Sequence, residues 1–187
     1  MRVTGGMVKG RRLASIQGQD IRPTSDKVRE AIFNLIGQDV SETKVLDLFA
    51  GTGSLGIEAL SRGAQRALFI DNSEKAVRLI RENLDRCGLG GRGFVVRKDL
   101  NKGLPWGSPL LREKMDLVFM DPPYRKGMIT PLLEALLDRQ VLSPLPVVVA
   151  ETSKTESLPH RVGKLRLVKE RRYGDTRIHI FTGGDEA

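Results

Sequence analysis

Hydrophobic positions along the chain follow two different spacings, and these spacings predict its elements. A short, nearly unbroken apolar run indicates a strand buried on both faces, and apolar residues three or four apart indicate a helix that packs on one face. Apolar runs predict strands at 45–49, 66–71, 93–98, 115–120 and 147–150. Helical spacing and capping residues predict helices at 25–36, 54–61, 74–87 and 129–139. Strands and helices that alternate in this way form an α/β fold with a parallel sheet covered on both faces.

The two ends of the chain depart from this alternation. Residues 2–16 are glycine-rich with short mixed runs, which predicts a hairpin or an extended arm. Residues 164–181 alternate around a Gly-Asp pair, which predicts a terminal antiparallel hairpin. We therefore expect a single domain, with an N-terminal hairpin and helix in 1–40 and a catalytic core in 41–187.

Charge is concentrated at these same ends. The 187-residue chain has a formal net charge of +8, which favours a polyanionic partner. Residues 1–19 contain four basic side chains and no acidic one, and residues 161–172 contain six basic side chains against Glu170.

Several classes of protein are not expected. No apolar run approaches the roughly 18 residues needed to span a bilayer, and no signal peptide is recognisable. The one cysteine, Cys87, excludes a disulfide framework, and His160 and His179 lack partners at zinc-ligand spacing. We expect a metal-free, cytoplasmic protein.

A glycine-rich turn follows the first predicted central strand. Residues 51–56 read Gly-Thr-Gly-Ser-Leu-Gly, which lets a strand turn sharply into a helix and lets a ligand approach the backbone. Asp71 ends the next strand, where its carboxylate can accept hydrogen bonds from both hydroxyls of a ribose. These two features fit either NAD or S-adenosyl-L-methionine.

Two further carboxylates favour S-adenosyl-L-methionine. Asp47 stands beside the turn in a D-x-F-x-G-x-G spacing, where it can accept from loop amides or face the ammonium of the cofactor. Asp99 follows the third strand, where it can accept from an adenine amino group. Such carboxylates repel a pyrophosphate but tolerate a net cationic ligand. The predicted cofactor-binding residues in this part of the chain are Asp47, Phe49, Gly51, Gly53, Asp71 and Asp99.

The segment Asp121-Pro122-Pro123-Tyr124 follows the fourth predicted strand. Its prolines remove two amide donors, so the turn presents carbonyl oxygens without competing N–H groups. Asp121 and the Pro122 carbonyl can accept the two N–H bonds of an exocyclic amine, and Tyr124 can stack on the base. Both motifs lie at carboxyl ends of strands in one sheet, so together they predict methyl transfer to such an amine, with Asp121, Pro122 and Tyr124 as catalytic residues.

The central segment resembles class I S-adenosyl-L-methionine-dependent methyltransferases that modify amines. Over nearly its full length the chain is similar to the RsmD family of 16S rRNA guanine-N2 methyltransferases. The segments that carry the resemblance are 2–6, 22–30, 33–34, 47–56, 58–63 and 121–124. The Arg-Pro-Thr sequence at 22–24 is the most diagnostic, because methyltransferases in general lack it.

The resemblance implies a Rossmann-like methyltransferase fold. Its sheet would have seven mostly parallel strands with an antiparallel last strand, preceded by a small N-terminal β-hairpin and a helix. Arg22 and Thr24 would lie near the carboxylate end of the cofactor. The substrate would be one guanine of 16S rRNA, the family's guanine 966 site, within the small ribosomal subunit or its assembly intermediate. We expect the enzyme to act as a monomer.

The basic ends supply the expected RNA contacts. Their residues flank segments that should border the pocket, so we expect them to form parts of one phosphate-facing surface. The predicted RNA-binding residues are Arg2, Lys9, Arg11, Arg12, Arg125, Lys126, Arg171 and Arg172.

Other functions remain open at this point. The same chemistry could act on adenine N6 in DNA or on a glutamine side chain in a protein. A DNA enzyme usually has a separate recognition domain of about a hundred residues, and glutamine-directed relatives generally carry Asn in place of Asp121. An NAD-dependent oxidoreductase would leave the Asp-Pro-Pro-Tyr turn unexplained, and a silent RNA-binding protein would be expected to have lost Asp121 or Gly51.

Overall fold

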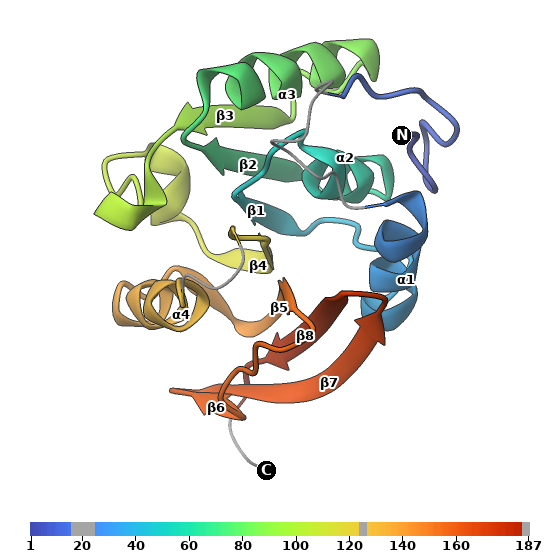
Figure 1. Cartoon of the computed structure of the whole chain (residues 1–187). Coiled ribbons are helices and arrows are strands. Elements are labelled where there is room, and N and C mark those ends of the chain that lie inside the picture. Colours follow the sequence, from blue (N-terminus) through green and yellow to red (C-terminus); the bar gives the residue numbers. More distant parts are fainter. Residues whose placement is uncertain (16–24, 124–126, 185–187) are drawn as a thin grey trace.

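The computed structural model describes residues 1–15, 25–123 and 127–184 of the chain. Within these ranges, eight strands form one sheet in the order β3-β2-β1-β4-β5-β8-β7-β6 (Figure 1). The strands are β1 (Lys44–Leu48), β2 (Arg66–Asp71), β3 (Gly93–Arg97), β4 (Met115–Met120), β5 (Leu142–Ser153), β6 (Arg161–Val162), β7 (Leu165–Tyr173) and β8 (Thr176–Thr182). The helices are α1 (Asp26–Ile36), α2 (Ser54–Ser61), α3 (Glu74–Arg86) and α4 (Ile129–Asp138), with 3-10 turns η1 (Leu100–Lys102) and η2 (Pro109–Arg112).

Five strands are parallel and the C-terminal part of the sheet is antiparallel. β1 pairs in parallel with β2 and β4, and β3 and β5 extend the parallel sheet on either side. β8 is antiparallel to β5 and to β7. The predicted fold class, a mostly parallel sheet with an antiparallel last strand, is confirmed. The strand that exceeds the expected seven is β6, which pairs with β7 through only two residue pairs.

β5 is the strand that the sequence predicted least well. It begins at Leu142 rather than Val147 and runs to Ser153 rather than Ala150. The missed first half contains Pro144 and Pro146, which are unfavourable inside a sheet. The pairing of β5 with β4 is irregular there, so the two prolines fall where the register between the strands shifts.

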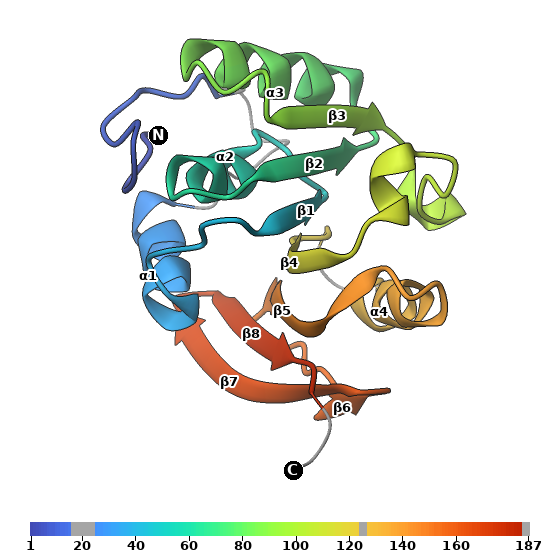
Figure 2. The ribbon, with the colours of Figure 1, turned by 180° about the vertical axis from the view of Figure 1, so that it is seen from behind.

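Helices cover both faces of the sheet, with α1, α2 and α3 on one face and α4 with η1 and η2 on the other (Figure 1, and from behind in Figure 2). Side chains of β1 point to both faces of the sheet. Val45 packs in the core under α1–α3, and Leu46 and Leu48 pack in the core under α4. Burial of both faces leaves the carboxyl ends of the parallel strands as the place where a ligand can bind. Among the helices of the described ranges, none combines the length and apolar character needed to cross a bilayer.

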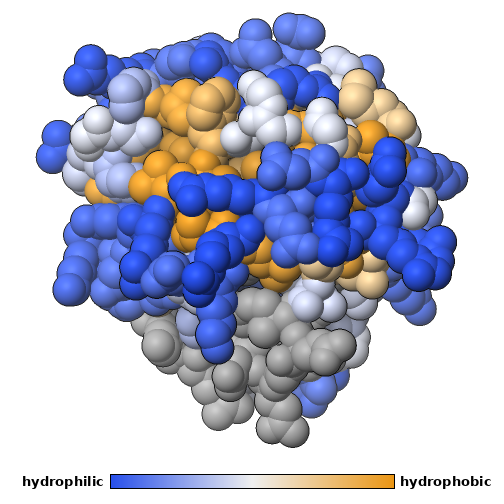
Figure 3. All heavy atoms as spheres, turned by 90° about the horizontal axis from the view of Figure 1, so that it is seen from above, coloured by the Kyte–Doolittle hydropathy of each residue, from blue (hydrophilic) through white to orange (hydrophobic). Residues whose placement is uncertain are grey.

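α3 is held by its apolar stripe rather than by its charges. Ile80 and Leu84 are buried in the core, whereas Arg86 pairs with Glu82 on the surface. The face over α3 is largely hydrophilic, with apolar surface between the polar side chains (Figure 3). Surface pairs of this kind contribute only about 0.2–0.5 kcal/mol each, so the buried stripe fixes the helix.

The N-terminal arm, residues 1–15, folds back on itself and docks on α2. Its hairpin has one bridge between Arg2 and Arg12, with Val3 N–H donating to the Arg11 carbonyl at 3.0 Å. A Cβ atom on Gly6 would lie 1.9 Å from the Ser61 carbonyl oxygen, so the arm can approach the end of α2 only without a side chain there. The predicted N-terminal hairpin and helix are therefore present.

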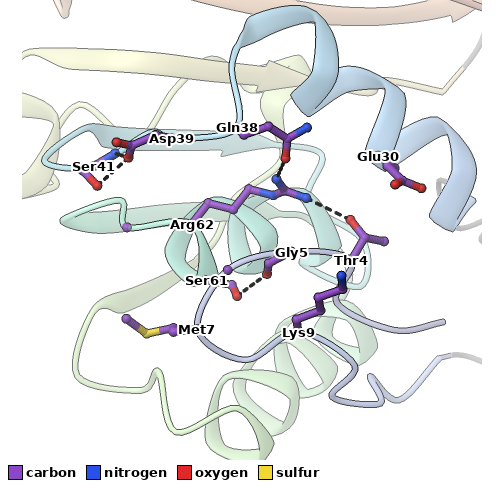
Figure 4. A pocket seen from close by; sticks show the side chains of 12 residues that line it. Thr4, Gly5, Met7, Lys9, Glu30, Gln38, Asp39, Ser41, Ser61 and Arg62 are labelled. Carbon is purple, nitrogen blue, oxygen red and sulfur yellow. Dashed lines mark hydrogen bonds between the residues drawn. The ribbon is translucent and has the colours of Figure 1, made fainter.

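A buried carboxylate joins this arm to α1 and α2. Glu58 on α2 is fully buried, and its carboxylate contacts Arg29 Nε at 3.0 Å and Arg62 Nη2 at 2.8 Å. The same carboxylate accepts hydrogen bonds from the Thr4 N–H and hydroxyl, each at 2.8 Å. Arg62 in turn extends between Thr4 and Gln38 in the hollow beside the arm (Figure 4). One side chain thus holds three segments that are far apart in the sequence.

Replacing this carboxylate should destabilise the fold strongly. We expect Glu58→Gln to lower the free energy of unfolding by about 3–5 kcal/mol, because the buried Arg29 would lose its buried carboxylate partner and keep only the exposed Asp26, which lies 3.0 Å from Arg29 Nη2. Urea unfolding of the variant and the parent protein measures the change. Glu82→Gln is the matched control, since Glu82 pairs with Arg86 on the surface and its loss should cost less than about 1 kcal/mol. Equal losses in the two variants would contradict the role of Glu58.

Candidate active site

A cavity of about 1240 Å³ opens at the carboxyl ends of the parallel strands. It is lined by the turns that follow β1, β2, β3 and β4, by the end of β5 and by the tip of the β7–β8 hairpin. The structure brings together most of the predicted cofactor and catalytic residues in this one cavity, namely Asp47, Phe49, Gly51, Asp71, Asp99, Asp121 and Pro122.

The remaining predicted residues of this site fall into two groups. Gly53 is not among the residues that line the cavity, but it caps the start of α2 with a left-handed backbone, φ 75°. The others lie outside the described residues: Arg22, Thr24 and Tyr124, together with the predicted RNA-binding residues Arg125 and Lys126.

Backbone geometry turns the chain sharply after β1. Phe49 has φ 61°, a left-handed conformation that costs a side-chain-bearing residue about 1–3 kcal/mol. The Ala50 N–H donates to the Ile70 carbonyl at 3.0 Å, so the strained residue is held on both sides by the sheet and the turn. Backbone strain of this kind persists only where the surrounding structure fixes it. The left-handed turn at Phe49 brings Phe49, Ala50 and Gly51 to the cavity wall.

The three glycine amides of the turn donate hydrogen bonds to two carboxylates and a backbone carbonyl. Gly51 N–H donates to Asp71 Oδ2 and Gly56 N–H donates to Asp47 Oδ2, each at 2.9 Å. Gly53 N–H donates to the Ala50 carbonyl at 2.7 Å. A pyrophosphate site needs such amides free to face the phosphates. The protein itself therefore uses the amides of Gly51, Gly53 and Gly56, which a pyrophosphate site would offer to its ligand.

Asp47 acts at the start of α2 in the way an N-cap side chain does, although it comes from β1. It accepts the N–H of a residue in the first helical turn, one of the groups that has no partner within the helix. Asp47 is only 2% exposed. Burial raises its pKa to about 8, the hydrogen bond from Gly56 opposes this shift, and the nearby Asp71 carboxylate adds to it.

Asp71 and Asp99 each accept a hydrogen bond from the backbone amide two residues further along the chain. Asp71 accepts from Ser73 N–H at 2.8 Å as well as from Gly51 N–H. Asp99 accepts from the backbone and side-chain amides of Asn101 at 3.0 and 2.9 Å, and these hydrogen bonds hold its pKa below the ordinary value. Each carboxylate retains lone pairs that can accept further hydrogen bonds from a ligand in the cavity.

Sequence reasoning missed two parts of the cavity wall. Glu151 lines the cavity at the end of β5, where it is 7% exposed. The tip of the β7–β8 hairpin, from Tyr173 to Thr176, forms a further part of the wall. The residue pattern predicted the hairpin, and the family resemblance suggested a Gly174-Asp175 loop near the base pocket without a role for it. The predicted β5 ended one residue before Glu151. A predicted strand that continued past Ala150 would have placed Glu151 beside Asp121, at the same edge of the sheet as the two motifs.

The predicted RNA-binding residues within the described ranges are all exposed, and they lie in two groups. Arg2, Lys9, Arg11 and Arg12 belong to the N-terminal arm, and Arg171 and Arg172 belong to β7, directly before Tyr173. α1 lies between the arm and the end of β7 (Figures 1 and 2). Lys169 Nζ donates to the Leu35 carbonyl of α1 at 2.8 Å, which ties β7 to this helix.

The pKa of Asp47 predicts a pH-dependent stability. Because the folded-state pKa of about 8 lies above the ordinary 3.8, the contribution of Asp47 is complete below about pH 4 and is lost as the pH rises through 8. Asp47→Asn keeps the acceptor for Gly56 N–H but cannot ionise. We expect its free energy of unfolding, relative to the parent, to rise between about pH 5 and 8 by more than roughly 1.4 kcal/mol, the equivalent of one pKa unit.

Urea titrations at several pH values measure this difference. The exposed Asp138→Asn variant controls for loss of a carboxylate, and its difference from the parent should stay nearly constant. A constant difference for Asp47→Asn as well would contradict the raised pKa of Asp47.

Solved structures share this fold. One titled "Putative methyltransferase yhhF from Escherichia coli" superposes with a TM-score of 0.83 and 28% identity, covering 100% of this chain and 99% of that chain. An RNA methyltransferase from Salinibacter ruber, solved in complex with S-adenosyl-L-homocysteine, superposes with a TM-score of 0.64 and 20% identity, covering 89% of this chain and 96% of that one. The fold is that of the class I S-adenosyl-L-methionine-dependent methyltransferases.

Sequence relatives extend over the same length. The chain is 39% identical over 182 residues to the "Putative rRNA methyltransferase YlbH" of Bacillus subtilis, covering 97% of this chain and 98% of the relative. It is 29% identical over 181 residues to the "Ribosomal RNA small subunit methyltransferase D" of Escherichia coli, covering 97% and 89%. The family model described as "Conserved hypothetical protein 95" matches residues 1–182. The chain therefore belongs to this family, the RsmD family.

Proposed function

We propose that this protein transfers a methyl group from S-adenosyl-L-methionine to the exocyclic N2 amine of a guanine in 16S rRNA. The observation that carries the proposal is that the glycine-rich turn after β1 and the Asp-Pro-Pro turn after β4 line the same cavity. We place the whole chain in one methyltransferase domain that acts as a monomer on the small ribosomal subunit or its assembly intermediate, in the cytoplasm.

S-adenosyl-L-methionine is the cofactor that suits the cavity. The acidic side chains Asp71 and Asp99 offer acceptors for ribose hydroxyls and an adenine amine, and the buried Asp47 holds the turn in place through Gly56 N–H. When bound, the cofactor would supply an electrophilic methyl group on a sulfonium. The N–C bond forms as the S–C bond breaks, a neutral thioether leaves, and one N–H proton of the amine passes to Asp121 or to water. A cationic ligand is compatible with this acidic lining, whereas a pyrophosphate is not.

Residues of the second turn hold the acceptor amine. Asp121 N–H donates to the Leu48 carbonyl at 3.4 Å, which ties the target-binding turn to the end of β1, directly before the cofactor turn. Asp121 accepts one N–H of the amine and the Pro122 carbonyl accepts the other. The nitrogen is then held with its lone pair free to attack, and positioning supplies most of the rate acceleration. Tyr124 stacks on the base.

An RNA substrate is supported by the relatives and by the charge. The Bacillus subtilis and Escherichia coli relatives are named as rRNA methyltransferases, the second for the small subunit. Exposed basic residues on the arm and on β7 lie on either side of α1. An extended RNA strand needs basic side chains spread over such a distance. The base must be unstacked to reach the cavity, so a loop guanine is favoured, and guanine 966 is the site we propose.

Methyl transfer to the proposed substrate is the first test. Labelled S-adenosyl-L-methionine and small subunits that lack native methylation should give label in N2-methylguanosine. Asp121→Ala should lower turnover by roughly 10²-fold or more with cofactor affinity nearly unchanged, as loss of a positioning group does. Asp71→Ala should weaken cofactor binding instead.

Binding titrations of the cofactor and single-turnover rates separate the two variants. Full turnover in Asp121→Ala would exclude its role in holding the amine. Cofactor binding without any label in RNA would move the target to adenine N6 in DNA or to a protein glutamine.

RNA affinity should depend steeply on salt. Contacts with roughly six phosphates should make the logarithm of affinity fall by about four to five per tenfold rise in salt, because bound counterions are released. Filter binding to small-subunit RNA between about 50 and 300 mM salt measures the slope. Arg171→Gln with Arg172→Gln should reduce its magnitude by about one to two, whereas the exposed Arg112→Gln on η2 should not. A flat response in the parent protein would contradict the phosphate-facing surface.

A further inference from the structure

Glu151 stands beside the turn that holds the amine. In the parallel pairing of β4 with β5, Met120 is the partner of Ala150, so Asp121 and Glu151 are the next residues on two adjoining strands. Both line the cavity. The acceptors that hold the amine and the carboxylate of Glu151 therefore reach the ligand from neighbouring positions at one edge of the sheet.

The carboxylate of Glu151 is fixed in this place. Its residue pairs with Ile178 of β8 in the sheet, and Thr176 Oγ1 donates to Glu151 Oε1 at 3.2 Å. Both side chains are buried, at 7% and 8% exposure. Thr176 belongs to the hairpin tip that also carries Tyr173 into the cavity wall. A buried, anchored carboxylate can select a hydrogen-bonding pattern, which a mobile surface side chain does poorly.

Guanine presents the pattern that a carboxylate accepts. Its N2 amine lies beside the N1–H group, so a base held by N2 offers a further donor on the same edge. Adenine presents an acceptor nitrogen, N1, beside its N6 amine. A carboxylate opposite that position would face a lone pair, and the unfavourable contact would reject the base.

We propose that Glu151 accepts the N1–H of the target base and so makes the site selective for guanine over bases that carry an acceptor at N1. This inference rests on the proposed function, since it assumes that Asp121 and Pro122 hold the N2 amine. Three donors on the guanine edge then meet three acceptors: Asp121, the Pro122 carbonyl and Glu151. Glu151 is a specificity residue, and Thr176 is the residue that positions it.

The test uses a base in which the hydrogen-bonding character of N1 is changed while the N2 amine is kept. 2,6-Diaminopurine keeps the N2 amine but has an acceptor at N1. Small subunits are reconstituted with 16S rRNA that carries either guanine or 2,6-diaminopurine at the nucleotide that the parent enzyme methylates. We expect the parent enzyme to prefer guanine by roughly 10²- to 10⁴-fold in kcat/KM. Equal rates on the two RNAs would overturn the inference without the need for any variant.

Glu151→Gln supplies the second readout. Its amide can donate to the N1 acceptor of 2,6-diaminopurine, so the preference for guanine should narrow by roughly tenfold or more while cofactor affinity stays unchanged. Glu134→Gln, the same substitution on the exposed face of α4, should keep the parent ratio. If Glu151→Gln lowered both rates by the same factor, the role of Glu151 would be structural only. Failure of the parent to methylate even the guanine RNA would instead reject the proposed function.

Discussion

The buried Glu58 carboxylate is the contact on which the arrangement of this enzyme depends. It lies between Arg29 and Arg62 and also accepts from Thr4, so the arm, α1 and α2 are held at one point. A buried ion pair adds little net stability over an apolar contact, but removal of one member is costly. Its value here is geometric, because α2 follows the cofactor turn directly and the segment at 22–24 leads into α1. The placement of α1 and α2 relative to each other therefore depends on this carboxylate.

A second buried acid organises the site itself. Asp47 holds the start of α2 and Asp71 holds the first glycine of the turn, so the loop keeps its shape through hydrogen bonds within the protein. The strained Phe49 lies between these contacts. In a dinucleotide site the same sequence pattern would offer its amides to phosphate. The carboxylates thus decide which ligand the pattern G-x-G-x-x-G serves.

The central elements could be predicted closely because apolar periodicity reports burial, and β2 and β4 were placed to the residue. The glycine turn and the Asp-Pro-Pro turn could be predicted as one site because parallel strands bring their carboxyl ends together. Glu151 could not be predicted as part of the site, because its position depends on the pairing of β5 with β4 and β8, and the hairpin tip is brought to the cavity by that same β5–β8 pairing. The two prolines also prevented the prediction of a strand in the first half of β5. The Glu58 network could not be predicted either, because Arg29 of α1 and Thr4 of the arm meet the Glu58–Arg62 pair of α2 only in the folded chain.

Most of the cavity wall comes from two separate lengths of chain, and the start of α1 adds Ser25, Lys27 and Val28. Residues 47–101 supply the wall of carboxylates and the glycine turn, whereas the Asp-Pro-Pro turn, Glu151 and the hairpin tip come from 121–176. Within the sheet, the hairpin joins the parallel strands only through the pairing of β8 with β5. With Glu151 selecting the base as we propose, we expect substitutions at the hairpin tip to alter which base is accepted without disturbing the cofactor wall. Because the two parts of the wall come from different lengths of chain, the choice of target base can diverge in evolution, or be redesigned, while residues 47–101 stay unchanged.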